Sequence, residues 1–294
     1  MAEYCIGTAQ FGMDYGIANL SGQPKQDDID KLMQYATKNN IRYFDTAQSY
    51  GKSETVIGEA ISKLSNINKI RIISKLSPDL QENSPELIVE SVKSSINKLN
   101  IKFLYALLAH RVEAIKSDTF LAAIRILKKD GLVIKTGVSV YTPEDALRVI
   151  KNNEVDILQI PFNILDKRWL DRGIIEEAKE NNIQVFFRSI FLQGLIFLNE
   201  KDLINRNMSW AYPYLKKFNA LVNDTPFSTV ELAFGILNQV SGNNVIIMGL
   251  DSLNQLQQNL SIIEKSVINE KVSDEWWANL PAFPEKLLNP SLWN

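Results

Sequence analysis

The chain alternates between short apolar segments typical of strands and longer segments typical of helices, and this alternation limits its fold more than any other feature. Eight apolar segments predict strands, at residues 4–8, 41–44, 70–74, 104–109, 132–138, 155–161, 183–190 and 244–248. The intervening segments carry helical periodicity, as in Ile29, Leu32, Met33 and Ala36 at i, i+3, i+4 and i+7. Such alternation predicts a parallel sheet. Eight units in about 250 residues match the size of a (β/α)8 barrel.

A doubly wound open sheet is the main alternative fold. It usually has a glycine-rich turn after its first strand, but the segment Gly7-Thr8-Ala9-Gln10-Phe11-Gly12 does not match G-x-G-x-x-G. No low-complexity linker or break in composition indicates a second domain. We therefore predict an α/β protein, a (β/α)8 TIM barrel, as a single domain over residues 1–294.

Several helix starts are marked by capping residues. Ser84 precedes Pro85, Thr142 precedes Pro143-Glu144-Asp145, and Ser252 precedes an apolar helical pattern. Between the seventh strand and its helix we predict a long irregular stretch, roughly residues 196–225. A tail rich in tryptophan and proline follows the last predicted helix, with Trp276, Trp277, Pro281, Pro284 and Trp293.

Composition excludes several classes of protein. The formal net charge of −2 leaves no basic surface for nucleic acid and no polybasic membrane anchor. A single cysteine, Cys5, excludes an internal disulfide and fits a reducing cytoplasm. The first residues do not resemble a signal peptide, and no apolar run approaches the roughly 20 residues of a membrane span. With one histidine and one cysteine we also expect no metal site. The sequence predicts a cytoplasmic protein.

Polar residues end three consecutive predicted strands. Asp45, Lys75 and His110 each follow an apolar run, and Tyr50 comes five residues after Asp45. His110 is the only histidine of the chain. The carboxyl ends of neighbouring parallel strands lie at the same edge of a barrel, where active sites occur. We therefore expect these four side chains to lie close together.

The four residue types suit proton transfer to a carbonyl oxygen. A phenol has an ordinary pKa near 10, which a nearby ammonium lowers, and a buried lysine needs a counter-charge such as Asp45. Such a group can donate a proton as negative charge develops on the carbonyl oxygen. The hydride of a reduction has to come from a nicotinamide or a flavin. Each residue also has a structural interpretation, but three polar strand ends in a row favour a site.

The segment Phe44-Asp45-Thr46-Ala47…Tyr50-Gly51, with Lys75 and His110, resembles the aldo-keto reductases. The resemblance extends to the last strand and its helix, Gly249-Leu250-Asp251-Ser252…Gln255…Gln258-Asn259. It implies a (β/α)8 barrel that binds NADPH or NADH without a Rossmann domain. It also implies that Tyr50 is the general acid, that Lys75 and Asp45 lower its pKa, and that His110 orients the carbonyl.

The same resemblance implies the residues that bind the cofactor. Ser139 and Gln159 match positions that hold the nicotinamide carboxamide. The full expected set is Thr8, Ser139, Gln159, Arg188, Ser189, Gln193, Gly194, Gly249, Gln255, Gln258 and Asn259.

Three departures from the family pattern concern the cofactor. Val140 replaces an asparagine after the fifth strand, and Arg188 stands where a tyrosine often stacks on the nicotinamide. Gly249 and Gln255 replace the basic pair that commonly holds the 2′-phosphate of NADPH. We therefore expect NADH to bind about as well as NADPH.

The predicted function is reduction of a small aldehyde or ketone, with a sugar-derived carbonyl compound as one option. Two alternatives remain from the residues: a Schiff-base lyase or aldolase that uses Lys75, and a nucleotide-binding regulatory barrel with little turnover. The aromatic residues at 196–225 and in the tail could line a substrate pocket or could cap the barrel by packing; they are Trp210, Tyr212, Tyr214, Trp276, Trp277 and Phe283.

Overall fold

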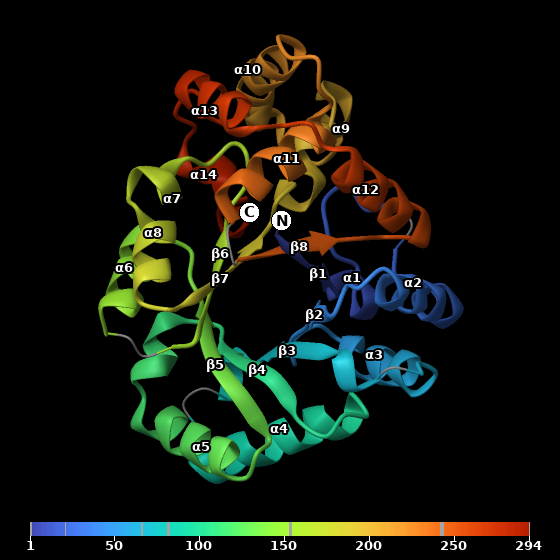
Figure 1. The fold of residues 1–294 in the computed structure, drawn as a ribbon, viewed down its shortest axis with the longest axis vertical. Coiled ribbons are helices and arrows are strands. Elements are labelled where there is room, and N and C mark those ends of the chain that lie inside the picture. Colours follow the sequence, from blue (N-terminus) through green and yellow to red (C-terminus); the bar gives the residue numbers. More distant parts are fainter. Residues whose placement is uncertain are drawn as a thin grey trace.

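The computed structural model describes residues 2–20, 22–65, 67–80, 83–152, 155–241 and 244–293. Eight parallel strands form a closed barrel in chain order, which confirms the predicted (β/α)8 fold (Figure 1). The strands are β1 (Glu3–Gly7), β2 (Tyr43–Asp45), β3 (Arg71–Lys75), β4 (Leu104–Ala109), β5 (Val133–Ser139), β6 (Ile157–Pro161), β7 (Gln184–Arg188) and β8 (Val245–Gly249).

Helices surround this ring of strands (Figure 1). The longer ones are α2 (Gln26–Lys38), α3 (Ser53–Ser62), α4 (Pro85–Lys98), α5 (Asp118–Lys129), α6 (Pro143–Asn152), α8 (Ile174–Glu180), α10 (Tyr212–Asn223), α11 (Thr229–Ser241), α12 (Leu253–Lys265) and α13 (Glu270–Asn279). Shorter ones are α1 (Ala9–Gly12), α7 (Arg168–Asp171), α9 (Glu200–Asn205) and α14 (Glu285–Leu288). The 3₁₀ helices are η1 (Ile67–Lys69), η2 (Pro78–Leu80), η3 (Val112–Lys116), η4 (Leu192–Phe197), η5 (Ser209–Ala211) and η6 (Pro290–Leu292).

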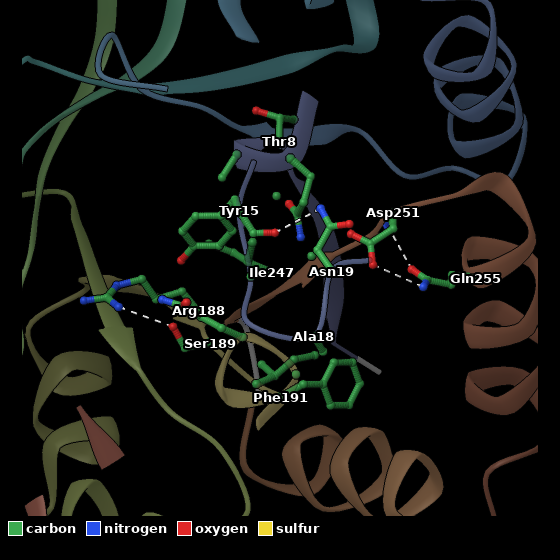
Figure 2. A pocket seen from close by; sticks show the side chains of 18 of the residues that line it. Thr8, Tyr15, Ala18, Asn19, Arg188, Ser189, Phe191, Ile247, Asp251 and Gln255 are labelled. Carbon is green, nitrogen blue, oxygen red and sulfur yellow. Dashed lines mark hydrogen bonds between the residues drawn. The ribbon is translucent and has the colours of Figure 1, made fainter. Parts of the chain in front are cut away.

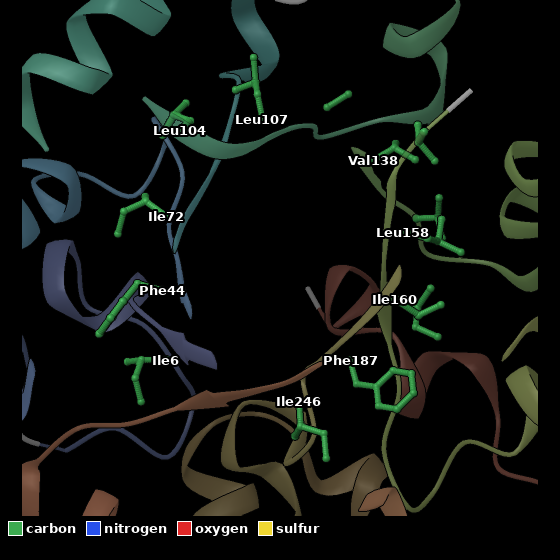
Figure 3. Packing of buried hydrophobic residues seen from close by; sticks show 14 of the residues in the cluster. Ile6, Phe44, Ile72, Leu104, Leu107, Val138, Leu158, Ile160, Phe187 and Ile246 are labelled. Atoms are coloured by element: carbon green, nitrogen blue, oxygen red, sulfur yellow. The ribbon is translucent and has the colours of Figure 1, made fainter. Parts of the chain in front are cut away.

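Side chains alternate between the two faces of the barrel wall. One set packs against the helices and points away from the centre of the ring, including Ile6, Phe44 and Ile72 (Figure 3). The neighbouring residues form a separate cluster inside the barrel: Cys5, Tyr43, Ile73, Ala106, Leu108, Ile157, Phe186, Val245 and Ile247. Because strand side chains alternate with a period of two, residues two positions beyond this inner cluster also face inward. This rule places Asp45 after Tyr43 and Lys75 after Ile73 at the carboxyl end of the interior.

The predicted helix caps are present. Ser84 Oγ accepts from Leu87 N at 3.4 Å, and Ser252 Oγ accepts from Gln255 N at 3.2 Å. Thr142 Oγ1 likewise accepts from Asp145 N at 3.2 Å. These short polar side chains satisfy amide groups that have no partner within the helix.

The prediction of an irregular stretch at 196–225 is wrong, because α9, η5 and α10 occupy most of it. Helix α9 begins with a capping box formed by Asn199 and Asp202. Helix α10 buries Leu215, Phe218 and Val222 on one face. Pro213, which suggests a break, lies in the first turn of α10, where its missing N–H costs no hydrogen bond.

The aromatic residues of this region and of the tail belong to a second hydrophobic cluster, formed mainly by α9, α10, α11, α13 and α14. Trp276 is 5% exposed and donates from Nε1 to Ile164 O at 2.9 Å. Trp277 stacks on Phe162 with ring centroids 5.8 Å apart. Of the two interpretations of these aromatic residues, the structure supports packing. Within the described residues, no helix is long and apolar enough to cross a membrane.

Candidate active site

A groove with a volume of about 410 Å³ opens at the carboxyl edge of the barrel. Figure 2 shows the groove between Thr8, Arg188 and Asp251, which follow or end β1, β7 and β8. Asp45 and Tyr50, at and after the end of β2, also line it. All but two of the residues expected to bind a cofactor also line it: Thr8, Arg188, Ser189, Gln193, Gly194, Gly249, Gln255, Gln258 and Asn259. The exceptions are Ser139 and Gln159, which lie behind the groove surface.

Asp45 and Lys75 form a buried ion pair at the ends of β2 and β3. Lys75 Nζ lies 2.6 and 2.7 Å from the two carboxylate oxygens of Asp45 and donates a third bond, 3.0 Å long, to Thr46 O. Burial disfavours the ammonium, but the charges of Asp45 and then Tyr50 outweigh it and raise the pKa of Lys75. Because its pKa is raised, Lys75 remains protonated at neutral pH, and all three of its N–H groups donate hydrogen bonds. This arrangement does not favour a nucleophilic lysine.

Tyr50 lies on a turn that packs tightly against the end of α1. A Cβ on Gly12 would lie 1.9 Å from Tyr50 O, and a Cβ on Gly51 would lie 2.3 Å from Gly12 O. Gly51 also has a φ of +53°, which disfavours residues with a side chain. Two glycines therefore allow the close backbone contact that fixes the Tyr50 turn. Lys75 Nζ lies 5.2 Å from the centre of the Tyr50 ring.

The pKa of Tyr50 is raised, whereas the family resemblance implied that Lys75 and Asp45 lower it. Burial raises the pKa of the phenol, the ammonium of Lys75 lowers it, and the carboxylate of Asp45 raises it again. The net shift is upward, because Asp45 offsets much of the positive charge of Lys75 and burial is the largest cause. The phenol therefore holds its proton at neutral pH.

His110 follows β4 and is partly buried. Its Nε2 lies 3.3 Å from Ser49 Oγ. Burial, followed by the positive charges of Lys75 and Arg188, lowers the pKa of His110 to about 4. The imidazole is therefore neutral at pH 7 and can donate one hydrogen bond.

Ser139 and Gln159 contact groove residues from behind. Ser139 is 3% exposed, and its Oγ accepts from Arg188 Nε at 3.2 Å. Gln159 is fully buried and donates from Nε2 to Asp45 Oδ1 at 2.8 Å. Gln159 Oε1 has no hydrogen-bond partner within the described residues. Such a buried acceptor is costly unless a further donor reaches it.

The far end of the groove, beside α12, is acidic and amide-rich. Asp251 lines the groove, its N–H donates to Gln255 Oε1 at 2.8 Å, and its carboxylate lies 3.4 Å from Gln255 Nε2 (Figure 2). Among the described lining residues, this end contains no lysine or arginine.

The loop between α1 and α2 also covers the groove, although the sequence did not predict this. Tyr15, Gly16, Ala18 and Asn19 line the groove opposite the loop after β7 (Figure 2). Ala18 N lies 3.4 Å from Gln193 O, and Arg206 Nε donates to Ile17 O at 2.6 Å. Burial raises the pKa of Tyr15 to about 12. This loop has no hydrophobic periodicity, so its position beside the groove is seen only in the folded chain.

The groove fits a bound dinucleotide in three respects. It runs from Tyr50 to the start of α12, and a helix N-terminus attracts phosphate. Gly249 is exposed in its wall, where a Cβ would come within 3.1 Å of Gln10 Nε2. Amides supply hydrogen-bonding groups along it, from Asn19, Gln193, Gln258 and Asn259. Within the described residues no group of three or more His, Cys, Asp or Glu could hold a metal ion.

The closed parallel barrel has a buried ion pair and a groove at its carboxyl edge. These features define a class, the barrel enzymes with an active site at the strand ends. Comparison with known proteins gives the family. The family model described as "Aldo/keto reductase family" matches residues 3–278. The chain therefore belongs to the aldo/keto reductase family, whose members are oxidoreductases that reduce carbonyl compounds with NADPH or NADH.

The individual relatives are distant in sequence, but the matched regions cover most of each chain. Aldo-keto reductase YhdN of Bacillus subtilis is 21% identical over 84% of this chain and 87% of its own. The NADH-specific methylglyoxal reductase of Escherichia coli is 26% identical over 65% of this chain and 64% of its own. Among solved structures, the holo form of an aldo-keto reductase from Bacillus halodurans matches with a TM-score of 0.73 and 19% identity, over 96% of this chain and 93% of that one.

Proposed function

We propose that the protein reduces a small aldehyde or ketone to an alcohol, with Tyr50 as the proton donor. The observation that carries the proposal is the buried Asp45–Lys75 ion pair beside Tyr50, at the edge of a groove that fits a dinucleotide. When bound, the reduced nicotinamide supplies the hydride. Tyr50 supplies the proton to the carbonyl oxygen, and water returns a proton to the phenolate.

The neighbours of Tyr50 support this role by their charge. Lys75 stabilises the phenolate that remains after proton transfer, because its ammonium lies near the ring. Asp45 keeps that ammonium charged, and Gln159 fixes one oxygen of Asp45. Neutral His110 can donate a hydrogen bond to the carbonyl oxygen without delivering a charge.

We further propose that NADH serves at least as well as NADPH. A 2′-phosphate carries nearly two negative charges and is best held by arginine or lysine. Asp251 stands at the end of the groove beside α12 instead, and its carboxylate repels phosphate. The specificity named for the Escherichia coli relative is consistent with this proposal.

Replacement of Tyr50 by phenylalanine tests the proposed acid. Tyr50→Phe keeps the ring and removes the proton, so kcat for carbonyl reduction should fall by about 10²–10⁴-fold. Binding of NADH, followed by quenching of its fluorescence, should be nearly unchanged. Tyr105→Phe is the matched control, because Tyr105, near the start of β4, packs against the inner cluster and does not line the groove. Reduction by Tyr50→Phe within a few-fold of wild type would exclude Tyr50 as the acid.

A further inference from the structure

Arg188, the last residue of β7, is the only cationic residue among the described residues that line the groove. It shares this end of the groove with Asp45 and Tyr50. No carboxylate in the described part of the chain forms an ion pair with it. A partly buried guanidinium without a counter-charge is costly, so an anionic ligand would gain from binding there.

Neighbouring groups hold the guanidinium without using all of its donors. Nε donates to Ser139 Oγ at 3.2 Å, and the carbon of the guanidinium lies 4.4 Å from the centre of the Tyr141 ring. The terminal nitrogens each make one longer contact of 3.4 Å, to Ser189 Oγ and Val140 O. Arginine has five N–H donors, so one remains on each terminal nitrogen. A pair of this kind matches the two oxygens of a carboxylate.

The charge balance at this end of the groove is positive. Asp45 neutralises Lys75 by direct contact, and His110 is neutral at pH 7. Arg188 therefore contributes an uncompensated charge. Asp251 lies on the opposite side of the pocket (Figure 2), so the groove has a positive end beside Tyr50 and a negative end beside α12.

We propose that Arg188 binds an anionic group of the substrate, so that the enzyme prefers carbonyl compounds that also carry a carboxylate. The inference rests on the proposed function and names the substrate class for the same site. Arg188 lies at the Tyr50 end, where the carbonyl has to be placed for proton transfer, and its bond to Ser139 fixes its direction. The phosphates of a cofactor are the alternative anion, and the test separates the two.

The test compares two aldehydes of nearly the same shape and different charge, 4-carboxybenzaldehyde and 4-nitrobenzaldehyde, together with their 2- and 3-isomers. For Arg188→Gln we expect kcat/KM to fall about 10- to 100-fold for the best carboxylate isomer. The nitro compounds should lose much less, so that the ratio of kcat/KM between the carboxylate and the nitro compound falls in the variant. Each substrate is compared between wild type and variant, so their different intrinsic reactivities cancel. Arg188→Lys should restore part of the loss, because it keeps the charge without the planar pair of donors.

Arg111→Gln is the matched control, because Arg111 is an exposed cation next to His110 and does not line the groove. The inference is overturned if Arg188→Gln affects both kinds of aldehyde equally, or if Arg111→Gln reproduces its effect. It is also overturned if Arg188→Gln weakens NADH binding tenfold while the charge preference remains. That result would assign Arg188 to the cofactor.

Binding of benzoate separates failure of the inference from failure of the proposed function. If wild type reduces neither kind of aldehyde, the proposed function fails, and benzoate and nitrobenzene binding by calorimetry then decides the inference. Loss of benzoate binding in Arg188→Gln, with nitrobenzene unaffected, supports an anion site at Arg188. Equal benzoate binding by wild type and variant overturns it.

Discussion

Strand β3 carries one cation at each end of the barrel interior, and the two cations are held in different ways. At the carboxyl end Lys75 is 2% exposed and bound to Asp45. At the amino end Arg71 is partly exposed and lies over aromatic rings, 5.0 Å from the centre of Tyr43 and 5.1 Å from that of Tyr105. Tyr43 also donates to Glu3 Oε2 at 3.2 Å. One end buries its charge completely, and the other leaves it close to water.

This difference indicates what each end does. A buried ion pair contributes little net stability, because desolvation offsets the attraction, but removal of one partner is strongly destabilising. Cation–π contacts near the surface stabilise modestly, by about 0.5–1 kcal/mol, and do not require the cation to be fully desolvated. The carboxyl end therefore maintains a charge at a cost in folding energy, whereas the amino end closes the barrel at little cost.

The largest expected effect is at Lys75. Lys75→Met should lower carbonyl reduction by about 10²–10⁴-fold and, by leaving Asp45 buried and unpaired, lower the free energy of unfolding by about 3–5 kcal/mol. Arg71→Met, its counterpart at the other end, should cost only about 1 kcal/mol and leave activity unchanged. Urea denaturation and steady-state assays measure the two quantities.

A double variant separates the two effects of Lys75. Asp45→Asn combined with Lys75→Met removes both charges and should recover most of the lost stability without recovering activity. A double variant as unstable as Lys75→Met would contradict the unpaired carboxylate as the cause. A fully active double variant would contradict a function for the buried charge.

The next effect in size is the pH dependence contributed by His110. Its pKa is about 4 in the folded protein and near 6.5 when unfolded, so the unfolded chain binds more protons between these values. Stability contributed by neutral His110 is therefore present above pH 6.5 and is lost as the pH falls toward 4. At pH 5 the loss is about 2 kcal/mol. Denaturation of wild type and His110→Gln at pH 7.5 and pH 5 measures it, and identical pH slopes would refute the contribution.

The smallest expected effect concerns the choice of cofactor. Asp251→Ser removes the repelling carboxylate from the end of the groove and should improve NADPH binding about 3- to 10-fold, with less effect on NADH. Adding Gln255→Arg should increase the gain and make it sensitive to salt. Fluorescence titrations at two ionic strengths measure both cofactors. A wild type that already prefers NADPH a hundredfold would contradict the NADH proposal.

The barrel and the strand-end residues were predictable because both follow from local periodicity. Asp45 and Lys75 end apolar runs, and alternation along a strand determines which way they face. The helices α9 and α10 were missed although their signals are present, in the Asn199–Asp202 capping box and in the spacing of Leu215, Phe218 and Val222. Aromatic and proline residues concealed that pattern.

Other features depend on contacts between residues distant in sequence. Tyr15 and Arg188 both line the groove although they lie far apart in the sequence, and no hydrophobic periodicity links them. Ser139 and Gln159 align with the family pattern, but only the folded chain shows them behind Arg188 and Asp45. The direction in which the pKa of Tyr50 shifts also depends on burial, which cannot be read from the neighbouring charges alone.

The contact between Gly12 and the Tyr50 turn has a consequence for recombination between related genes. Gly12 and Gly51 occupy one small volume, with backbone atoms of each segment where the other would carry a side chain. A crossover between the two positions can therefore pair a glycine from one parent with a bulkier residue from the other. Such a chimera would displace the turn that bears Tyr50 even if each parent were fully functional. The two glycines have to be inherited together.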